Sequence, residues 1–241
     1  MSEKNILITN DDGIDSNGLA RLAEVAKNFG KVWVIAPDGQ RSATSHKIAI
    51  REPIDIYKVD FPVDGVEAYK MTGTPADCVR IGVPNIVKGK TDIVLSGINY
   101  GYNSGLDIQY SGTVGAAMEA ASMGIHAIAL SEAANEMHEV TDFYLSPVLS
   151  SMINYKLGFN QIWNVNFPGC TMSGFRGILP ERKVADIGLF IDKYVEEKLS
   201  DGGTRVTISN ECVKDAPDGT DLRALLDGYI SISRLMNISN R

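Results

Sequence analysis

Near the N-terminus four segments follow one another: an apolar run, a polar loop with glycine, a helical pattern and a second apolar run. NILIT (residues 5–9) is a short β-rich run, and the polar loop NDDGIDSNG (10–18) follows it. LARLAEVAKNFG (19–30) then places apolar residues at helical spacing, and KVWVIAP (31–37) is typical of a buried strand. This order predicts a right-handed βαβ unit with parallel strands, and we expect Gly30 to end its helix.

The same order of segments returns later in the chain. DIVLSG (92–97) predicts a strand, and a polar loop rich in glycine follows it. GAAMEAASMG (115–124) is compatible with a helix, and HAIALS (126–131) is typical of another strand. Two such units predict an α/β fold built on a doubly wound, mostly parallel sheet.

The C-terminal part of the chain has a different pattern. Beyond Pro168 the segments are typical of strands and hairpins, with a turn at Gly202 and Gly203, and YISISRL (229–235) alternates as a strand does. We therefore predict one α/β domain over residues 1–170, which would hold any catalytic site at the ends of its strands. We predict a β-rich extension with a C-terminal tail over residues 171–241, and we expect it to make subunit contacts.

Composition excludes several classes of protein. The chain has 241 residues, a formal net charge of -7 and no cluster of Lys or Arg, so we expect no binding to a nucleic acid polymer. The N-terminal segment lacks the apolar core of a signal peptide, and no apolar stretch approaches the roughly 20 residues of a membrane span. The three cysteines show no CxxC spacing, which argues against a disulfide framework. These features predict a cytoplasmic protein with no membrane partner.

Polar loops follow three of the predicted strands, and together the three loops suggest a metal site. Asp11 and Asp12 stand where the first strand ends, and adjacent carboxylates resist joint ionisation unless a cation is near. Ser42 and Asn99, in the loops after two other strands, offer further oxygen atoms. Oxygen ligands without imidazole or thiolate suit Mg²⁺ or Mn²⁺ rather than zinc. The alternative is that one aspartate caps the following helix while the other lies in solvent.

The segment YSGTVGAAMEAA (110–121) begins a predicted helix with small and hydroxyl residues. Such a start exposes backbone N–H groups to an anion, so we expect Ser111, Gly112 and Thr113 to cradle a phosphate. The alternative for Ser111 or Thr113 is plain helix capping. In GTPAD (73–77), Thr74 and Pro75 favour the structural interpretation of a helix start. No Walker motif, GxGxxG fingerprint or GxSxG elbow is present, so a metal with a phosphate is the chemistry that remains.

Several segments, in order along nearly the whole chain, carry a resemblance to one family. They are ILITNDDGIDSNGL, APDGQRSATSH, GTPADCVRIG, DIVLSGINYGYNSGLDIQYSGTVGAAMEAA, NVNFPG and GTDLRALLDGYISISRL. Together they resemble the stationary-phase survival protein SurE family. The resemblance implies a metal-dependent 5'-nucleotidase with a Rossmann-like fold, assembled as a homodimer or homotetramer.

The resemblance also assigns roles to residues by motif. The implied ligands of one divalent ion per subunit, Mg²⁺ or Mn²⁺, are Asp11, Asp12, Ser42 and Asn99. The residues that would face the phosphate are Asn103, Ser111, Gly112 and Thr113. The expected reaction is hydrolysis of nucleoside 5'-monophosphates and, as a broader activity, of other phosphate esters. Asp11 or Asp12 would take a proton from the attacking water. The alternative is a nucleotide-binding sensor without catalysis.

Overall fold

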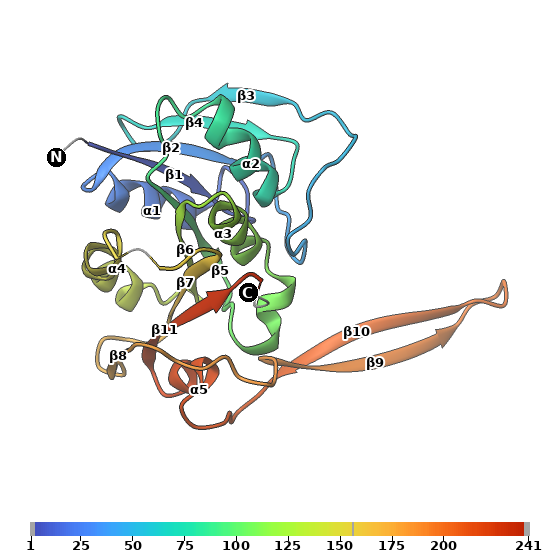
Figure 1. The fold of residues 1–241 in the computed structure, drawn as a ribbon. Coiled ribbons are helices and arrows are strands. Elements are labelled where there is room, and N and C mark those ends of the chain that lie inside the picture. The colour runs from blue at the N-terminus through green and yellow to red at the C-terminus, as the bar shows by residue number, and fades with distance from the viewer. Residues whose placement is uncertain (1–2, 156, 239–241) are drawn as a thin grey trace.

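The computed structural model describes residues 3–155 and 157–238, and a central sheet runs through the molecule (Figure 1). Within those residues the sheet has nine strands, which are, in spatial order, β3 (Ile56–Val59), β4 (Glu67–Met71), β2 (Gly30–Pro37), β1 (Lys4–Thr9), β5 (Ile93–Tyr100), β6 (His126–Glu132), β7 (Gln161–Phe167), β11 (Tyr229–Met236) and β8 (Gly177–Leu179). Neighbours from β4 to β7 are parallel, whereas β3 and β11 run antiparallel to β4 and β7. The predicted α/β fold with a mostly parallel sheet is confirmed.

Helices cover both faces of this sheet (Figure 1). On one face, α1 (Asn17–Ala26) and α4 (Glu139–Met152) pack in a core with side chains such as Ile6 and Ile8 of β1. On the other face, α2 (Pro75–Asn85) and α3 (Gly112–Ser122) pack against Leu7 and Trp33. Since strands buried on both faces need apolar side chains in both directions, the continuous apolar runs of β1 and β2 specify their central place. This is the Rossmann-like, doubly wound arrangement that the sequence predicted.

Two predictions about helix ends have different outcomes. Thr74 caps α2 by accepting a hydrogen bond from the Asp77 N–H, the Asp77 carboxylate bonds back to the Thr74 N–H, and Pro75 begins the helix, so GTPAD is a helix start. The prediction that Gly30 ends the first helix is wrong: α1 ends at Ala26, and Gly30 is the first residue of β2. A Cβ atom at Gly30 would lie 2.3 Å from the carbonyl oxygen of Lys4. Glycine is needed there for the close approach of β1 and β2.

The order of strands fixes where a ligand can bind. From β1 the chain adds β2 and β4 on one side, and it then returns to place β5, β6 and β7 on the other side. The direction of winding therefore reverses between β1 and β5. In open parallel sheets this reversal leaves a crevice outside the carboxyl ends of the strands.

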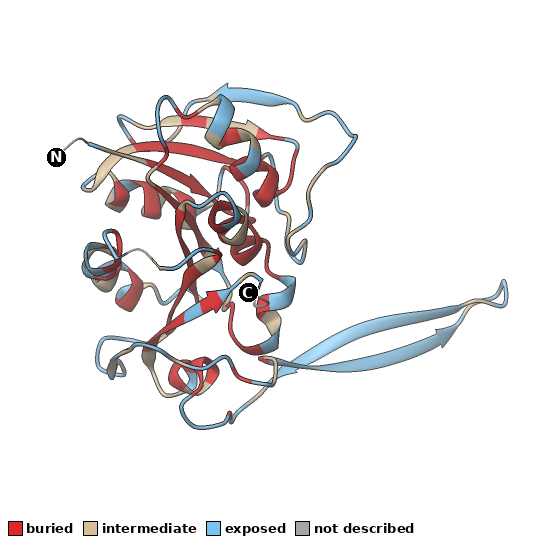
Figure 2. Cartoon of the chain, viewed as in Figure 1, coloured by how far each residue is buried: buried red, intermediate tan, exposed pale blue. Residues whose placement is uncertain are grey.

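The C-terminal segment contributes to two places. Strands β9 (Phe190–Lys198) and β10 (Thr204–Cys212) form the predicted hairpin, with its turn around Gly202 and Gly203. The hairpin projects from the body as an arm that is exposed along its length (Figure 2). The strand β11, by contrast, lies between β7 and β8 in the central sheet. The predicted extension thus supplies both an arm and part of the sheet, and the domain boundary at residue 170 stays a prediction.

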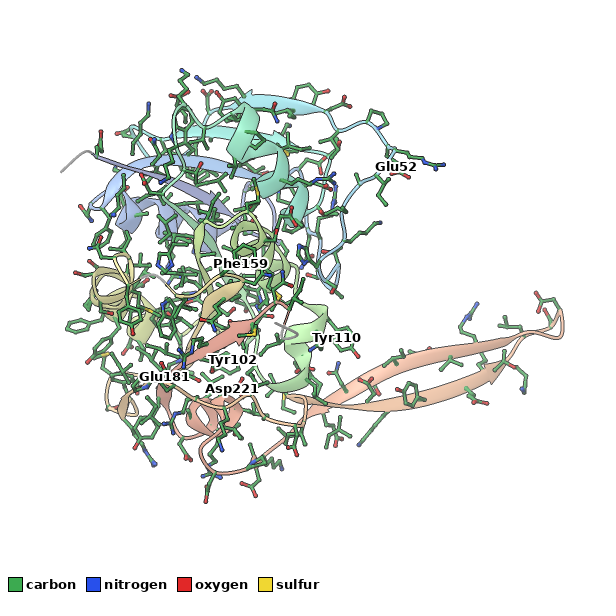
Figure 3. All side chains as sticks on the ribbon, in the orientation of Figure 1. Glu52, Tyr102, Tyr110, Phe159, Glu181 and Asp221 are labelled. Carbon is green, nitrogen blue, oxygen red and sulfur yellow. The ribbon has the colours of Figure 1, made fainter. Side chains whose placement is uncertain are left out.

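A buried carboxylate joins this C-terminal segment to the rest of the fold. Asp221, labelled in Figure 3, begins the short helix α5 (Asp221–Leu226). It accepts hydrogen bonds from the N–H groups of Gly105 at 3.0 Å and Ala185 at 2.9 Å, and Gly105 begins the 3-10 helix η1 (Gly105–Tyr110). These bonds tie the base of the arm to the loop after β5. Among residues 3–155 and 157–238, none of the helices has the length and apolar character needed to cross a bilayer.

Candidate active site at the carboxyl end of the sheet

Asp11 lies two residues beyond the end of β1 and is only 4% exposed. Its Oδ1 accepts a hydrogen bond from the Thr113 hydroxyl at 2.6 Å, and its Oδ2 accepts one from the Thr113 N–H at 3.2 Å. Burial raises the pKa of Asp11 to about 6; the Thr113 hydroxyl opposes the shift, and the charge of Asp12 adds to it. The first turn of α3 therefore contacts Asp11 directly, and these two hydrogen bonds do not offset the cost of burying the negative charge.

Asp12 lies beside it and is less buried. Its Oδ2 accepts a hydrogen bond at 3.0 Å from the N–H of Tyr100, the last residue of β5. Burial raises the pKa of Asp12, and the Tyr100 N–H opposes the shift. Neither carboxyl forms an ion pair with a Lys, Arg or His side chain in the described part of the chain. Two neighbouring, partly desolvated carboxylates without a cationic partner are what a divalent ion would neutralise, so the residues present fit such an ion.

The loop after β2 is held against this pair through its backbone. The Arg41 N–H donates to the carbonyl oxygen of Asp11 at 2.6 Å, and the Thr44 hydroxyl donates to the carbonyl of Arg41 at 2.8 Å. Ser42, the next residue, is exposed, and its Oγ accepts a hydrogen bond from Gln40 at 3.0 Å. The structure thus brings the loop that carries Ser42 to the aspartate pair.

Asn99 reaches the same edge from β5. Its Nδ2 donates to the carbonyl of Gly101 at 2.7 Å, which leaves Oδ1 as the atom suited to a cation. Across the described ranges there is no group of three or more His, Cys, Asp or Glu side chains that could hold a metal. An ion here would rest on two carboxylates, neutral oxygens of Ser42 and Asn99, and water, which is the environment that Mg²⁺ accepts.

The start of α3 supplies the residues predicted to hold phosphate. The Ser111 hydroxyl caps the helix by accepting from the Val114 N–H at 3.0 Å, and the Thr113 hydroxyl is bonded to Asp11. A Cβ atom at Gly112 would lie 2.9 Å from Thr44 Oγ1 and 3.0 Å from Asp11 Oδ2. Only glycine leaves this space open. An anion could bind at the positive end of α3 and in the space at Gly112. The contacts of Ser111, Gly112 and Thr113 with phosphate stay a prediction.

Asn103 lies in a different cluster. Its side chain donates to the Ser131 hydroxyl at 2.8 Å, and its N–H donates to Asn166 Oδ1 at 2.8 Å. The amides of Asn164 and Asn166 donate to its carbonyl oxygen. These bonds connect the loop after β5 to the ends of β6 and β7 rather than to the aspartate pair. The phosphate role of Asn103 stays a prediction.

A cavity of about 370 Å³ opens beside Asp12. Residues from α1, β5, β6 and the loops around them line it, among them Asp12, Arg21, Gln40, Tyr100, Glu132 and His138. Sequence reasoning did not identify Arg21 or Glu132 as site residues. A signal was present for Glu132, since it follows the predicted strand HAIALS as a polar residue at its carboxyl end.

A family model described as "Survival protein SurE" matches residues 6–187. The chain belongs to the SurE family. A protein named 5'-nucleotidase SurE from Clostridium botulinum (strain Langeland) is 37% identical over 237 residues, which are 96% of this chain and 92% of that protein. One of the same name from Thermoanaerobacter pseudethanolicus is 38% identical over 95% of this chain and 90% of its own length. The crystal structure of the SurE protein from Aquifex aeolicus has a TM-score of 0.83 and 34% identity, covering 98% of this chain and 95% of that one. The predicted family is confirmed.

Proposed function

We propose that the chain hydrolyses nucleoside 5'-monophosphates to a nucleoside and phosphate at the carboxyl end of its sheet, using one divalent ion, Mg²⁺ or Mn²⁺, per subunit. The activity is supported by relatives named 5'-nucleotidase SurE that align with nearly the full chain. The observation that carries the metal is the desolvated Asp11 and Asp12 pair without a basic partner in the described residues. Ser42 and Asn99 would complete the ligands.

The residues around the pair have separable tasks. A bound divalent ion supplies Lewis acidity, which polarises the phosphoryl group and lowers the pKa of a water molecule. The positive end of α3, with Gly112 at its first turn, favours the negative phosphate. Both oxygens of Asp11 already accept from Thr113, whereas Asp12 lines the cavity and accepts one backbone bond. Asp12 is therefore the aspartate we assign to take the proton from the attacking water.

A nucleotide sensor without catalysis is not favoured. A sensor needs a site for phosphate, but it does not need two adjacent carboxylates beside that site, where they repel an anion. The relatives that align with the whole chain carry the name of an enzyme. A nucleotidase that binds a metal ion therefore accounts for the adjacent carboxylates, and a sensor does not.

Metal reconstitution tests the proposal. Protein treated with a chelator should release no phosphate from AMP, and Mg²⁺ or Mn²⁺ should restore release, because the donor set is made of oxygen atoms. Restoration by Zn²⁺ alone would overturn the metal assignment. Turnover that persists in EDTA would overturn the metal mechanism, and absence of turnover with every ion would favour the sensor.

We further propose that the arm formed by β9 and β10 contacts a second copy of the chain in a homodimer or homotetramer. One side of the arm, called the apolar side here, carries the exposed side chains of Phe190, Tyr194, Val206 and Ile208. Tyr194 faces Ile208 across the two strands, and Val206 faces Glu196 in the adjoining pair. The opposite side carries the ion pairs of Lys193 with Glu211 and of Arg205 with Glu197. A lone two-stranded ribbon is marginally stable in water, and its exposed apolar side needs cover.

Charge placed on that apolar side should dissociate the assembly. Tyr194→Glu with Ile208→Glu should lower the mass measured by light scattering, because two buried carboxylates without partners oppose association. Val195→Glu is the matched control, since Val195 lies on the opposite side of the same strand and is also exposed. An unchanged mass in the double variant, or an equal loss in the control, would contradict the assignment of this side.

A cytoplasmic location is part of the proposal. The described cysteines Cys78, Cys170 and Cys212 are all free thiols, and burial raises the pKa of Cys78 and of Cys170. Free thiols fit a reducing compartment, where disulfides are rare.

A further inference from the structure

The cavity beside Asp12 is built around a buried ion pair. The Glu132 side chain is 5% exposed, and its Oε1 accepts from Arg21 Nη1 at 2.6 Å while its Oε2 accepts from Arg21 Nη2 at 3.2 Å. Nδ1 of His138 lies 3.1 Å from Glu132 Oε1. Arg21 also reaches Asp142 on α4 at 2.5 Å. A carboxylate held by a two-pronged guanidinium has one orientation, so its remaining lone pairs are presented in a fixed direction.

The position of this carboxylate follows from the sheet. Tyr100 pairs with Glu132 in the register of β5 and β6, and the Tyr100 N–H also binds Asp12. Asp12, in the loop after β1, and Glu132, at the end of β6, therefore lie on opposite sides of the end of β5, and both line the same cavity. A phosphate beside Asp12 and the sugar attached to it can bridge this span across the cavity.

The charged side chains that line the cavity determine which groups of a ligand can bind there. Asp12, Glu132 and Glu136 contribute negative charges, and Arg21 shares its positive charge between Glu132 and Asp142. A second phosphate group is therefore repelled, whereas a hydroxyl group can donate to a carboxylate. In dinucleotide-binding folds an acidic residue at a strand end holds ribose hydroxyls for the same reason.

We propose that Glu132, positioned by Arg21, accepts hydrogen bonds from the ribose hydroxyls of the substrate and makes the chain select ribonucleotides over 2'-deoxyribonucleotides. This inference rests on the proposed nucleotidase function and adds the selectivity of its site. Glu132 is thus a specificity residue that contacts substrate, and Arg21 is a positioning residue that acts through it.

The test compares AMP with 2'-deoxyAMP. The wild type should prefer AMP in kcat/KM by at least about tenfold, which is the least expected for a hydrogen bond to a charged group. In Glu132→Gln the preference should fall to about threefold or less, mainly through a higher KM for AMP, because an amide is a weaker acceptor and lacks the charge. Calorimetric titration of the chelated protein with adenosine and 2'-deoxyadenosine should show the same order of affinity without any turnover.

Asp142→Asn is the matched control. It removes a carboxylate from the same arginine, but outside the cavity, so the preference for AMP should remain. If Glu132→Gln fails to fold by circular dichroism, the double variant Arg21→Gln with Glu132→Gln removes both charges and should show the same loss of preference. Equal use of AMP and 2'-deoxyAMP by the wild type would overturn the inference while the proposed function stands. So would a preference for AMP that survives in Glu132→Gln or in the double variant. Absence of AMP hydrolysis with Mg²⁺ and Mn²⁺ would instead refute the proposed function.

Discussion

Replacing Asp12 by Asn is expected to lower kcat for AMP by at least about a hundredfold, because a direct ligand and the proposed base are lost together and even outer residues of metal sites cost 10-fold to 100-fold. The metal-free variant should melt at the same temperature as the wild type or higher. The raised pKa of Asp12 shows that its charged form is disfavoured in the fold, and the pKa of Asp11 is raised further by its neighbour. Removing the charge relieves both effects, while the Asn side chain can still accept from Tyr100.

Melting curves with EDTA and with Mn²⁺, beside a phosphate-release assay, separate this outcome from a structural role. Added Mn²⁺ should raise the melting temperature of the wild type more than that of the variant, because stabilisation by a ligand grows with its affinity. Asp15→Asn removes the same charge from an exposed position of the same loop, and it should leave both measurements unchanged. An Asp12→Asn variant that is less stable yet active would make Asp12 a structural carboxylate.

Gly112→Ala is expected to reduce kcat/KM for AMP by about a hundredfold, the effect of misplacing reacting groups by roughly 1 Å. The added methyl group would meet Thr44 Oγ1 at 2.9 Å and Asp11 Oδ2 at 3.0 Å, so it must displace the carboxylate or fill the space at the first turn of α3. The helix itself should tolerate alanine, which has the higher helix propensity. The loss should therefore appear in the kinetics of a protein that stays folded at the assay temperature, which a melting curve of the chelated variant checks.

Gly39→Ala provides the comparison, since a Cβ atom there has only Arg41 Nη1 nearby, at 3.9 Å. It makes the same chemical change in the loop after β2 and should leave kcat/KM within about twofold, as expected for a methyl group in open space. Full activity in Gly112→Ala would show that the space at Gly112 is not used by the substrate. A large loss of stability in that variant would assign Gly112 to packing instead.

The parts of the fold that the sequence predicted are those specified by local patterns. Continuous apolar runs predicted β1 and β2 because both of their faces are buried, and the turn at Gly202 and Gly203 predicted the hairpin. The place of β11 between β7 and β8 was not predictable, because its alternation describes a strand but not its neighbours. Gly30 was misassigned for a related reason: its role is a close contact with Lys4, a residue distant in sequence.

The candidate site shows the same division. The sequence predicted a site at Asp11 and Asp12, because the carboxylates of two adjacent residues lie close together and repel each other in any fold. The bond from Thr113 to Asp11 and the pairing of Arg21 with Glu132 join segments about a hundred residues apart, so only the fold reveals them. For Thr113 the sequence suggested a hydroxyl facing phosphate, and the structure shows that hydroxyl on Asp11.

The most direct test of a metal-dependent nucleotidase at the aspartate pair is a titration of the chelated protein with Mn²⁺. Bound Mn²⁺ is followed by the loss of the electron paramagnetic resonance signal of the free ion, and phosphate release from AMP is measured at each point. We expect binding of one Mn²⁺ per chain, with turnover rising in proportion to the occupied fraction, since the ion supplies the chemistry of the step. Turnover that is complete before Mn²⁺ is added, or that does not follow occupancy, would contradict the account.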